Sequence, residues 1–226
     1  MYTVTHGTYR TPRGRSVTLS YREDTNDHNV LFSCLDGDEY RLAELHLEGM
    51  ALDIGAHIGG VTVALAVDNP DLRIVAIEAV PPNVDLLREN VKRCGLSERV
   101  TVIQAAAGKG KTAEVRWAFS GSTSADHHAF IGNSSILGSE VTSQTASVPV
   151  RTLASLAAEF GAFSFAKVDC ENCEYDFLAG PALSKVALIR GEYHREPEPL
   201  MSVLGRTHDT TFAHVSPGAF EAVRRA

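Results

Sequence analysis

The stretch LDIGAHIGGVTVALA, residues 52–66, indicates the fold of this chain. It places a glycine-bearing turn directly between a short apolar run and a segment of helical composition. Gly55 and Gly59 permit tight backbone turning and close approach of a ligand, and the start of the helix offers free N–H groups. The spacing is G-x-x-x-G, which differs from the G-x-G-x-x-G of dinucleotide-binding folds. Many α/β folds use a single glycine turn for packing, so its meaning depends on the residues around it.

Strand and helix patterns alternate on both sides of this turn. Apolar runs predict strands, and amphipathic stretches between them predict helices. Strands are predicted over 50–55, 73–79, 99–106, 163–169 and 185–194, helices over 59–69, 81–95 and 151–161, and a C-terminal helix over 199–205 before an antiparallel strand pair over 210–215 and 219–226. Several strands are nearly all apolar, as expected when helices cover both faces of a parallel sheet. The sequence therefore predicts a doubly wound α/β fold.

The N-terminal segment does not follow this alternation. SVTLSY (16–21) and NVLFSC (29–34) alternate in polarity and predict a hairpin-like strand pair. Residues 36–49 predict a helix. Because no low-complexity linker follows, we interpret residues 1–49 as a cap on a single domain whose core spans 50–226.

A long insert over residues 107–149 interrupts the core. TAEVRWAF (112–119) predicts a strand, and residues 120–148 are rich in Ser, Gly and Thr. Loops of this length in compact domains are functional or disordered, and we favour a mobile lid or substrate loop rather than plain disorder. His127 and His128 lie in this loop, where they either reach the substrate when the lid closes or belong to a solvated polar surface.

Composition narrows the class of protein. The 226 residues include 28 Asp and Glu against 21 Lys and Arg, for a net charge of −7. An acidic surface repels phosphate backbones, which argues against nucleic acid as a partner. The apolar runs fall well short of the roughly 20 residues of a membrane helix, and the polar N-terminus has no signal-peptide pattern. We therefore expect a cytoplasmic protein.

Four cysteines are scattered along the chain: Cys34, Cys94, Cys170 and Cys173. In a cytosolic protein they are expected to be reduced thiols. Cys170 and Cys173 form a C-x-x-C pair, but the chain has a single such pair and no histidine in the zinc-finger pattern. We favour two small residues on a turn after a buried strand over a redox or zinc role.

Acidic residues end three of the predicted strands: Asp53, Glu78 and Asp169. Nucleotide ligands of doubly wound sheets bind at the carboxyl ends of the strands, where the strand order reverses. A carboxylate in the position of Glu78 can accept hydrogen bonds from both ribose hydroxyls, and the alternative is a solvated charge at a strand end. Together with the glycine turn, these acids predict a nucleotide site.

The motifs occur in an order that resembles one known family. LDIGAHIGGVTVALA is followed by VAIEAVPPNVDLLRENVKRCGL (75–96), VTVIQAAAGKGKTAEV (100–115), VPVRTLASL (148–156) and FAKVDCENCEYDFLAG (165–180). The chain is similar to the FkbM family of S-adenosylmethionine-dependent methyltransferases over roughly residues 50–194. The resemblance implies a class I methyltransferase fold, with a Rossmann-like, seven-stranded, mostly parallel sheet whose last strand is antiparallel. It also implies methyl transfer to a hydroxyl of a sugar or natural product.

The resemblance also implies roles for individual residues. For the cofactor, S-adenosylmethionine, it implies Asp53, Gly55, His57 and Gly59 at the methionine part, Glu78 at the ribose, and Gln104, Ala105 and Ala106 at the adenine. Ala79, next to Glu78, is also expected to bind the cofactor. Beyond the cofactor it implies the signature acids Asp169, Glu171 and Glu174 and an E-x-H pair, Glu192 and His194. Two positions depart from the family pattern: His57 stands where Asn is frequent, and Asn172 replaces a signature glycine.

Methyl transfer to a hydroxyl needs a group that removes the acceptor's proton. We expect Asp169 or His194 to be this base, with Glu192 orienting the acceptor or the histidine. The alternative for His194 is a structural role. The same three residues are hard or borderline metal ligands, but the sequence favours a site without a metal.

The sequence leaves three functions open. The first is O-methylation of a small molecule. The second is methylation of nucleic acid, which the net charge and the lack of a dense basic stretch disfavour. The third is a non-catalytic or non-methylating protein on the same fold. The expected partner is a small-molecule acceptor, with neither nucleic acid nor membrane, and a homodimer is among the oligomeric states left open.

Overall fold

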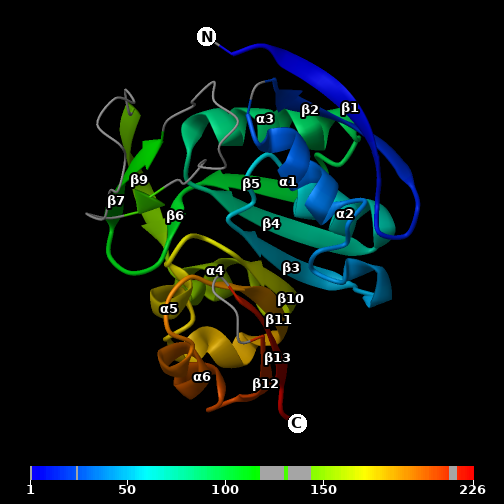
Figure 1. Ribbon diagram of the computed structural model, residues 1–226. Helices are drawn as coiled ribbons and strands as arrows, with labels where there is room; N and C mark the ends of the chain where they lie inside the picture. Colours follow the sequence, from blue (N-terminus) through cyan, green and yellow to red (C-terminus); the bar gives the residue numbers. More distant parts are fainter. Residues whose placement is uncertain (1, 24, 118–129, 132–143, 214–217) are drawn as a thin grey trace.

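The computed structural model describes residues 2–23, 25–117, 130–131, 144–213 and 218–226. Its centre is a sheet of seven strands (Figure 1). In order across the sheet these are β12 (His208–Phe212), β13 (Gly218–Arg224), β11 (Val186–Tyr193), β10 (Phe163–Val168), β3 (Gly49–Ile54), β4 (Leu72–Glu78) and β5 (Val100–Gln104). β13 is antiparallel to both of its neighbours, and the other neighbouring pairs are parallel. The predicted seven-stranded, mostly parallel sheet is confirmed.

Helices cover both faces of this sheet (Figure 1). One face carries α1 (Asp27–Cys34), α2 (Gly60–Asp68) and α3 (Pro81–Arg93), and the other carries α4 (Leu153–Phe160), α5 (Glu174–Phe177), the 3₁₀ helix η2 (Pro181–Lys185) and α6 (Glu198–Leu204). Along β4, Ile74 and Ala76 are buried against the first group, and Val75 and Ile77 against the second. Burial on both sides explains why the middle of this strand, residues 74–77, is apolar on both faces. Within the described ranges, no helix is both long and apolar enough to span a membrane.

Thr152 begins α4 with a reciprocal pair of hydrogen bonds. Ser155 N donates to Thr152 Oγ1 at 3.0 Å, and Thr152 N donates to Ser155 Oγ at 3.1 Å. We expect Thr152→Ala to lower the free energy of unfolding by about 0.5–2 kcal/mol, because the free N–H groups of the first turn lose a partner. Urea denaturation measures the effect, and Thr152→Ser, which keeps the hydroxyl, is the matched control. Equal urea midpoints for wild type and the alanine variant would contradict this role.

The N-terminal hairpin has different strands from those predicted. β1 (Val4–Arg10) pairs antiparallel with β2 (Ser16–Arg22), while NVLFSC belongs to α1, which corrects the strand predicted over 29–34. The buried residues of α1 are Asp27, Leu31 and Cys34, at the helical spacing i, i+4, i+7. A short apolar run fits both periods, and the packing of this helical face on the core decides between them.

The helix predicted over 36–49 is also wrong. The segment contains a single 3₁₀ turn, η1 (Leu42–Glu44). Asp38 and Arg41 have φ values of 46° and 52°, and Gly49 has 78°. These left-handed conformations interrupt a helix, so the segment runs as an irregular connection between α1 and β3.

Buried polar contacts fasten this N-terminal cap to the core. Arg22 Nε donates to Asp27 Oδ2 at 2.7 Å, and both side chains are buried. Arg22 Nη2 also donates to Asn83 Oδ1 of α3 at 2.7 Å. Ser20 N donates to Asn90 Oδ1 of the same helix at 2.7 Å. Because these contacts join β2, α1 and α3, they hold α1 over the core (Figure 1).

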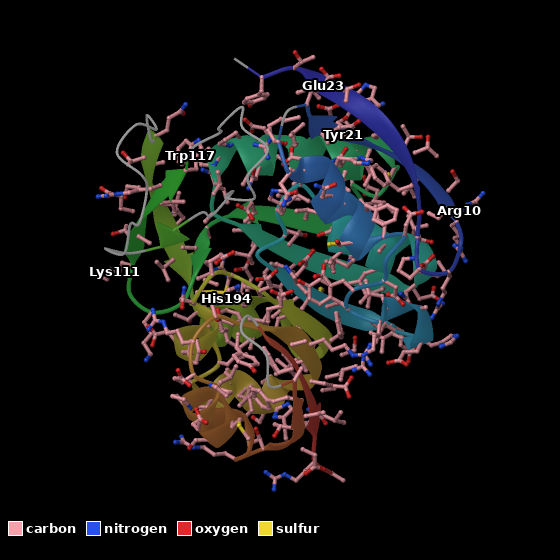
Figure 2. The ribbon with its side chains drawn as sticks, viewed as in Figure 1. Arg10, Tyr21, Glu23, Lys111, Trp117 and His194 are labelled. Carbon is pink, nitrogen blue, oxygen red and sulfur yellow. A yellow bond between two sulfur atoms is a disulfide. The ribbon has the colours of Figure 1, made fainter. Side chains whose placement is uncertain are left out.

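The insert forms a second sheet beside the main one (Figure 1). Its strand order is β6 (Ala106–Ala107), β9 (Gln144–Arg151), β7 (Thr112–Trp117) and β8 (Phe130–Ile131). The strand predicted over 112–119 is confirmed as β7, and Trp117 is buried against Val115 and Val148 (Figure 2). The lid predicted over 120–148, with His127 and His128, falls mostly outside the described residues.

Candidate active site

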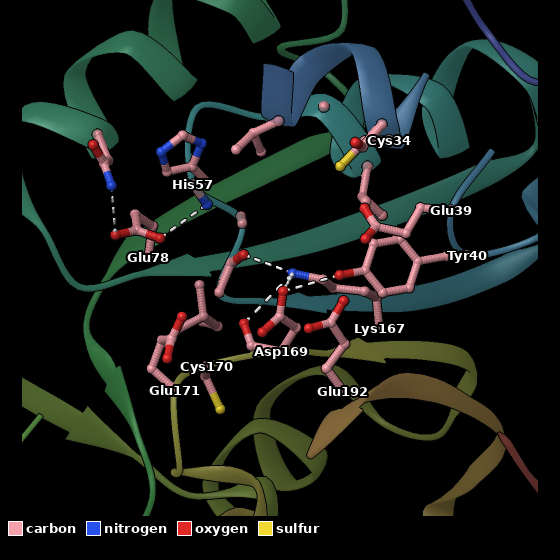
Figure 3. Close-up of a pocket in the computed structure, with 18 of the residues that line it drawn as sticks. Cys34, Glu39, Tyr40, His57, Glu78, Lys167, Asp169, Cys170, Glu171 and Glu192 are labelled. Atoms are coloured by element: carbon pink, nitrogen blue, oxygen red, sulfur yellow. Dashed lines mark hydrogen bonds and ion pairs between the residues drawn. The ribbon is translucent and has the colours of Figure 1, made fainter. Parts of the chain in front are cut away.

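A cavity of about 380 Å³ lies at the carboxyl ends of the parallel strands (Figure 3). From β3 the sheet extends through β4 and β5 on one side and through β10 and β11 on the other, so the strand order reverses between β3 and β10. Such reversals are the ligand sites of doubly wound sheets. The cavity wall comes from α1, the glycine turn after β3, and the ends of β4, β10 and β11. Its size suits a small molecule.

Gly55 allows the two central strands to end against each other. Its φ is +75°, and a Cβ atom at this position would lie 1.7 Å from the carbonyl oxygen of Asp169. Neither the backbone conformation nor the space suits a larger residue. The turn continues through His57, whose φ is 50°, and both residues line the cavity.

Asp53 and Gly59 support the turn from behind the cavity wall. The Asp53 side chain is fully buried, accepts a hydrogen bond from Thr62 Oγ1 at 2.5 Å and lies 3.9 Å from Lys167 Nζ. Burial raises the pKa of Asp53, and the Lys167 charge opposes that rise. Gly59 precedes α2 with a φ of 100°. These two residues shape the turn without facing the cavity.

Glu78 ends β4 with its carboxylate held from several directions (Figure 3). Oε2 accepts a hydrogen bond from His57 N at 2.9 Å. Oε1 accepts from Val80 N at 2.9 Å and from Asn83 Nδ2 at 3.3 Å. Burial raises the pKa of Glu78, while these donors favour the charged form. Glu78 and the adjoining Ala79 line the cavity, where Oε2, which accepts a single hydrogen bond, keeps acceptor capacity for a ligand.

Lys167 is a buried cation that the sequence motifs did not single out. Its Nζ donates to the carbonyl oxygen of Gly55 at 2.8 Å and lies 3.5 Å from Asp169 Oδ2 (Figure 3). Burial alone would lower the pKa of Lys167, but Asp169 and Asp53 raise it, so the ammonium group stays charged. The sequence could have pointed to Lys167, because a lysine inside the apolar strand FSFAKV is expected to be buried and then needs a charged partner.

Asp169 and Glu192 form the floor of the cavity at the ends of β10 and β11. Tyr40 Oη donates to Asp169 Oδ2 at 2.9 Å. Burial opposes the charged form of Asp169, but Lys167 lowers its pKa. Burial, followed by the charges of Asp169 and Glu39, raises the pKa of Glu192 to about 7. The floor therefore concentrates negative charge.

His194 (labelled in Figure 2) follows β11 and is not among the residues that line the cavity. Its Nδ1 is 3.0 Å from Oε1 of the fully buried Glu174. Its Nε2 is 3.7 Å from Asp169 Oδ1 and 3.9 Å from Glu192 Oε2. Burial would lower the pKa of His194, but the bond with Glu174 and the nearby carboxylates raise it to about 9. The fold thus brings the three predicted catalytic residues together, and their individual roles stay predictions.

The signature loop after Asp169 contains two residues with left-handed backbone. Glu171 has a φ of 55° and Asn172 a φ of 79°. Asparagine tolerates this conformation better than most residues, which explains how Asn172 takes the place of the signature glycine. Arg195 Nε donates to Asn172 Oδ1 at 2.7 Å and ties the loop to the segment after β11.

Cys170 and Cys173 form a disulfide across the same loop. This corrects the prediction that both are reduced thiols. The turn brings their Cα atoms to 5.4 Å, a separation that a disulfide spans. Cys34 and Cys94 are free thiols, one buried and one half-buried.

The predicted site residues fall into two groups. Those that line the cavity are Gly55, His57, Glu78, Ala79, Ala105, Asp169 and Glu192. Those outside the wall are Asp53, Gly59, Gln104, Ala106 and His194. Ala107 lines the cavity in place of Ala106, because successive residues of an extended chain point in opposite directions.

The N-terminal cap supplies wall residues that the motifs missed. They are Asn26, Asn29, Val30, Ser33 and Cys34 on or beside α1, and Glu39 and Tyr40 after it. Asn26, Asn29, Val30 and Ser33 have the spacing i, i+3, i+4, i+7 of one helical face. This spacing in the sequence could have indicated a helical face on the cavity, but it was overlooked because a strand was predicted over 29–34.

The fold and this site define a class of protein. The fixed carboxylate of Glu78 is suited to accept hydrogen bonds from ribose hydroxyls. The acidic floor around Asp169 and Glu192 is suited to attract a positively charged sulfur. The residues present therefore fit S-adenosylmethionine. On a seven-stranded sheet with a single antiparallel strand, they define the class I methyltransferases.

A profile of the methyltransferase FkbM domain matches residues 53–215. The chain therefore belongs to the FkbM family of S-adenosylmethionine-dependent methyltransferases, which confirms the resemblance of its motifs. It is also similar to the O-methyltransferase imqG of Aspergillus flavus, with 37% identity over 57 residues. That match covers 25% of this chain and 23% of the Aspergillus protein, so the two align over about a quarter of that protein's length.

Solved structures share the fold at low sequence identity. The precorrin-6y C5,15-methyltransferase of Geobacter metallireducens superimposes with a TM-score of 0.51 at 12% identity, over 84% of this chain and 87% of that one. TrmK of M. capricolum, solved with S-adenosylhomocysteine, gives a TM-score of 0.50 at 9% identity, over 80% and 65% of the two chains. Both likenesses concern the fold alone.

Proposed function

We propose that this protein transfers a methyl group from S-adenosylmethionine to a hydroxyl of a small molecule. The proposal is carried by one observation: the glycine turn and Glu78 line the same cavity as the carboxylates of Asp169 and Glu192. A hydroxyl acceptor needs both a site for the methyl donor and a group that accepts its proton. The short likeness to an O-methyltransferase supports the choice of hydroxyl.

The cavity wall offers residues for each part of the cofactor. Glu78 would accept hydrogen bonds from the ribose, and the turn around Gly55 and His57 would hold the methionine part. Small side chains at Ala105 and Ala107 would leave room for the adenine. The net charge of −7 also favours a small acceptor over a polyanionic one.

When bound, S-adenosylmethionine supplies an activated methyl group, whose carbon–sulfur bond breaks as the carbon–oxygen bond to the acceptor forms. The acceptor's proton must leave in the same reaction. Glu192 and Asp169 face the cavity, whereas His194 stands behind it. Because Asp169 Oδ2 is engaged by Tyr40 and Lys167, Glu192 is the more available proton acceptor.

Calorimetry with S-adenosylhomocysteine tests cofactor binding. We expect saturable binding by wild type and roughly 10- to 100-fold weaker binding by Glu78→Gln, because the ribose loses a hydrogen bond to a charged acceptor. Glu98→Gln, on an exposed residue away from the cavity, is the control and should bind as wild type does.

Incubation with S-adenosylmethionine and a metabolite extract tests the reaction. A product that gains one methyl mass on oxygen supports the proposal and identifies the acceptor. Absence of binding of either S-adenosylmethionine or S-adenosylhomocysteine would overturn it. Binding without any methylated product would favour a non-catalytic protein on this fold.

A further inference from the structure

Three metal-ligating groups converge at the ends of β10 and β11. One ligand atom from each of Asp169, Glu192 and His194 lies within 4.8 Å of the others. His194 Nε2 is 3.7 Å from Asp169 Oδ1 and 3.9 Å from Glu192 Oε2, which is longer than a hydrogen bond. An ion held at about 2.0–2.3 Å from each atom would span these separations. We infer that Asp169, Glu192 and His194 form a divalent-cation site in the floor of the cavity.

The histidine is oriented from outside this set of ligands. Glu174 is fully buried, and its Oε1 accepts a hydrogen bond from His194 N at 3.1 Å and lies 3.0 Å from Nδ1. The Nδ1 proton is directed at Glu174, so Nε2 faces the two carboxylates and becomes the ligand atom when a cation displaces its proton. A carboxylate behind a histidine in this way orients metal ligands in proteins.

Asp169 is oriented in a comparable way. Its Oδ2 accepts a hydrogen bond from Tyr40 and lies near Lys167, while its other oxygen, Oδ1, faces His194. Tyr40 and Lys167 therefore fix one oxygen and leave the second for an ion. The ligands come from two strand ends and are held by residues from other segments.

The charge and chemistry of the surroundings select the kind of ion. Glu171 Oε2 lies 3.7 Å from His194 Nε2 and adds a third carboxylate, and Glu39 lines the same cavity. Carboxylates and imidazole suit hard and borderline divalent ions such as Mg²⁺, Mn²⁺ or Zn²⁺. The sequence favoured a site without a metal, because the clustering of Asp169, Glu192 and His194 could only be inferred there from the topology.

A cation here would act on the acceptor, and this step rests on the proposed function. Asp169 and Glu192 line the cavity, so open coordination positions of the ion would face the substrate. An acceptor with two adjacent oxygens, such as a vicinal diol or catechol, would bind both to the ion, which makes its hydroxyl a stronger acid. Glu192 Oε1 would remain available for the proton, since Oε2 is the oxygen nearest His194.

A neighbouring cluster provides the competing site. Ligand atoms of Cys170, Cys173 and Glu174 also lie within 4.8 Å of one another. The disulfide removes both thiolates as ligands, so binding should not depend on these cysteines. The double variant Cys170→Ser/Cys173→Ser therefore separates the two sites.

Titration of the metal-free protein with Mn²⁺, followed by calorimetry and electron paramagnetic resonance, tests the inference. We expect wild type to bind one Mn²⁺ with a Kd below about 1 mM. His194→Ala and Glu192→Gln should abolish this binding, and Glu174→Gln should weaken it roughly 10- to 100-fold. The cysteine double variant and Asp209→Asn, whose side chain is 81% exposed, should bind as wild type does.

Each sample is also titrated with S-adenosylhomocysteine, which reports folding and cofactor binding independently of the metal. Wild type that binds S-adenosylhomocysteine but no Mn²⁺ would overturn the cation site and leave the proposed function standing. Mn²⁺ binding that survives in both His194→Ala and Glu192→Gln, or disappears in the cysteine double variant, would also overturn it. Mn²⁺ binding without S-adenosylhomocysteine binding would contradict the proposed function while supporting the site.

Discussion

Glu192→Gln is expected to lower kcat for methyl transfer by about 10²- to 10⁴-fold, the range typical for loss of a positioned proton acceptor. The amide keeps the shape of the side chain but neither accepts the proton nor carries charge. Glu192 lines the cavity floor beside Asp169, on the side away from Glu78 (Figure 3). The affinity for S-adenosylhomocysteine should therefore stay near the wild-type value.

Steady-state kinetics on the acceptor identified from the extract would measure this effect on kcat. Glu98→Gln is the matched control, because Glu98 is exposed and is not among the residues that line the cavity. The assay is run with and without added Mn²⁺. Unchanged kcat in Glu192→Gln under both conditions would show that another group takes the proton and that no ion bound by Glu192 contributes.

Lys167→Met is expected to lower the free energy of unfolding by about 3–5 kcal/mol, as when one partner of a buried ion pair is removed. The methionine fills a similar volume but leaves Asp53 and Asp169 without the cation that lies 3.9 Å and 3.5 Å from them. It also removes the donor to the carbonyl oxygen of Gly55 at 2.8 Å. The loss should be large because all these groups lie in or beside the central sheet.

The pH dependence of this loss follows from Asp169. The fold lowers the pKa of Asp169: burial raises it, but the charges of Lys167 and His194 and the hydrogen bond from Tyr40 together outweigh burial. A lowered folded-state pKa contributes stability above the unfolded value, near 3.9, and this stability is lost as the pH falls through the folded value. The variant lacks this contribution, so the difference between wild type and Lys167→Met should narrow on acidification.

Urea denaturation at neutral and acidic pH measures both effects. Lys92→Met, on the exposed side of α3, is the control and should unfold at the wild-type urea concentration. If Lys167→Met also had the wild-type midpoint at neutral pH, the buried charge group would not stabilise the sheet. A deficit that grows on acidification would contradict the role given to Asp169.

The core of the fold could be predicted because its signals are local. β4 is apolar on both faces, and the pattern of Ile74 to Ile77 is visible without any knowledge of its neighbours. Gly55 and Gly59 mark the turn in the same way. The cap could not be predicted this way, because NVLFSC fits both a strand and a helix, and only its contacts with the core separate the two.

The candidate site also has a part that could be predicted from the sequence and a part that could not. Asp169, Glu78 and Glu192 could be placed at one edge because the carboxyl ends of parallel strands meet there, whatever the details of packing. Residue types and periodicity therefore determine the sheet, its covering helices and the acids that end the strands. The partners of those acids are decided by three-dimensional packing: Tyr40 reaches Asp169, and Glu174 orients His194. These residues lie far apart in the chain, and they meet only after the sheet has assembled and the cap has closed on it.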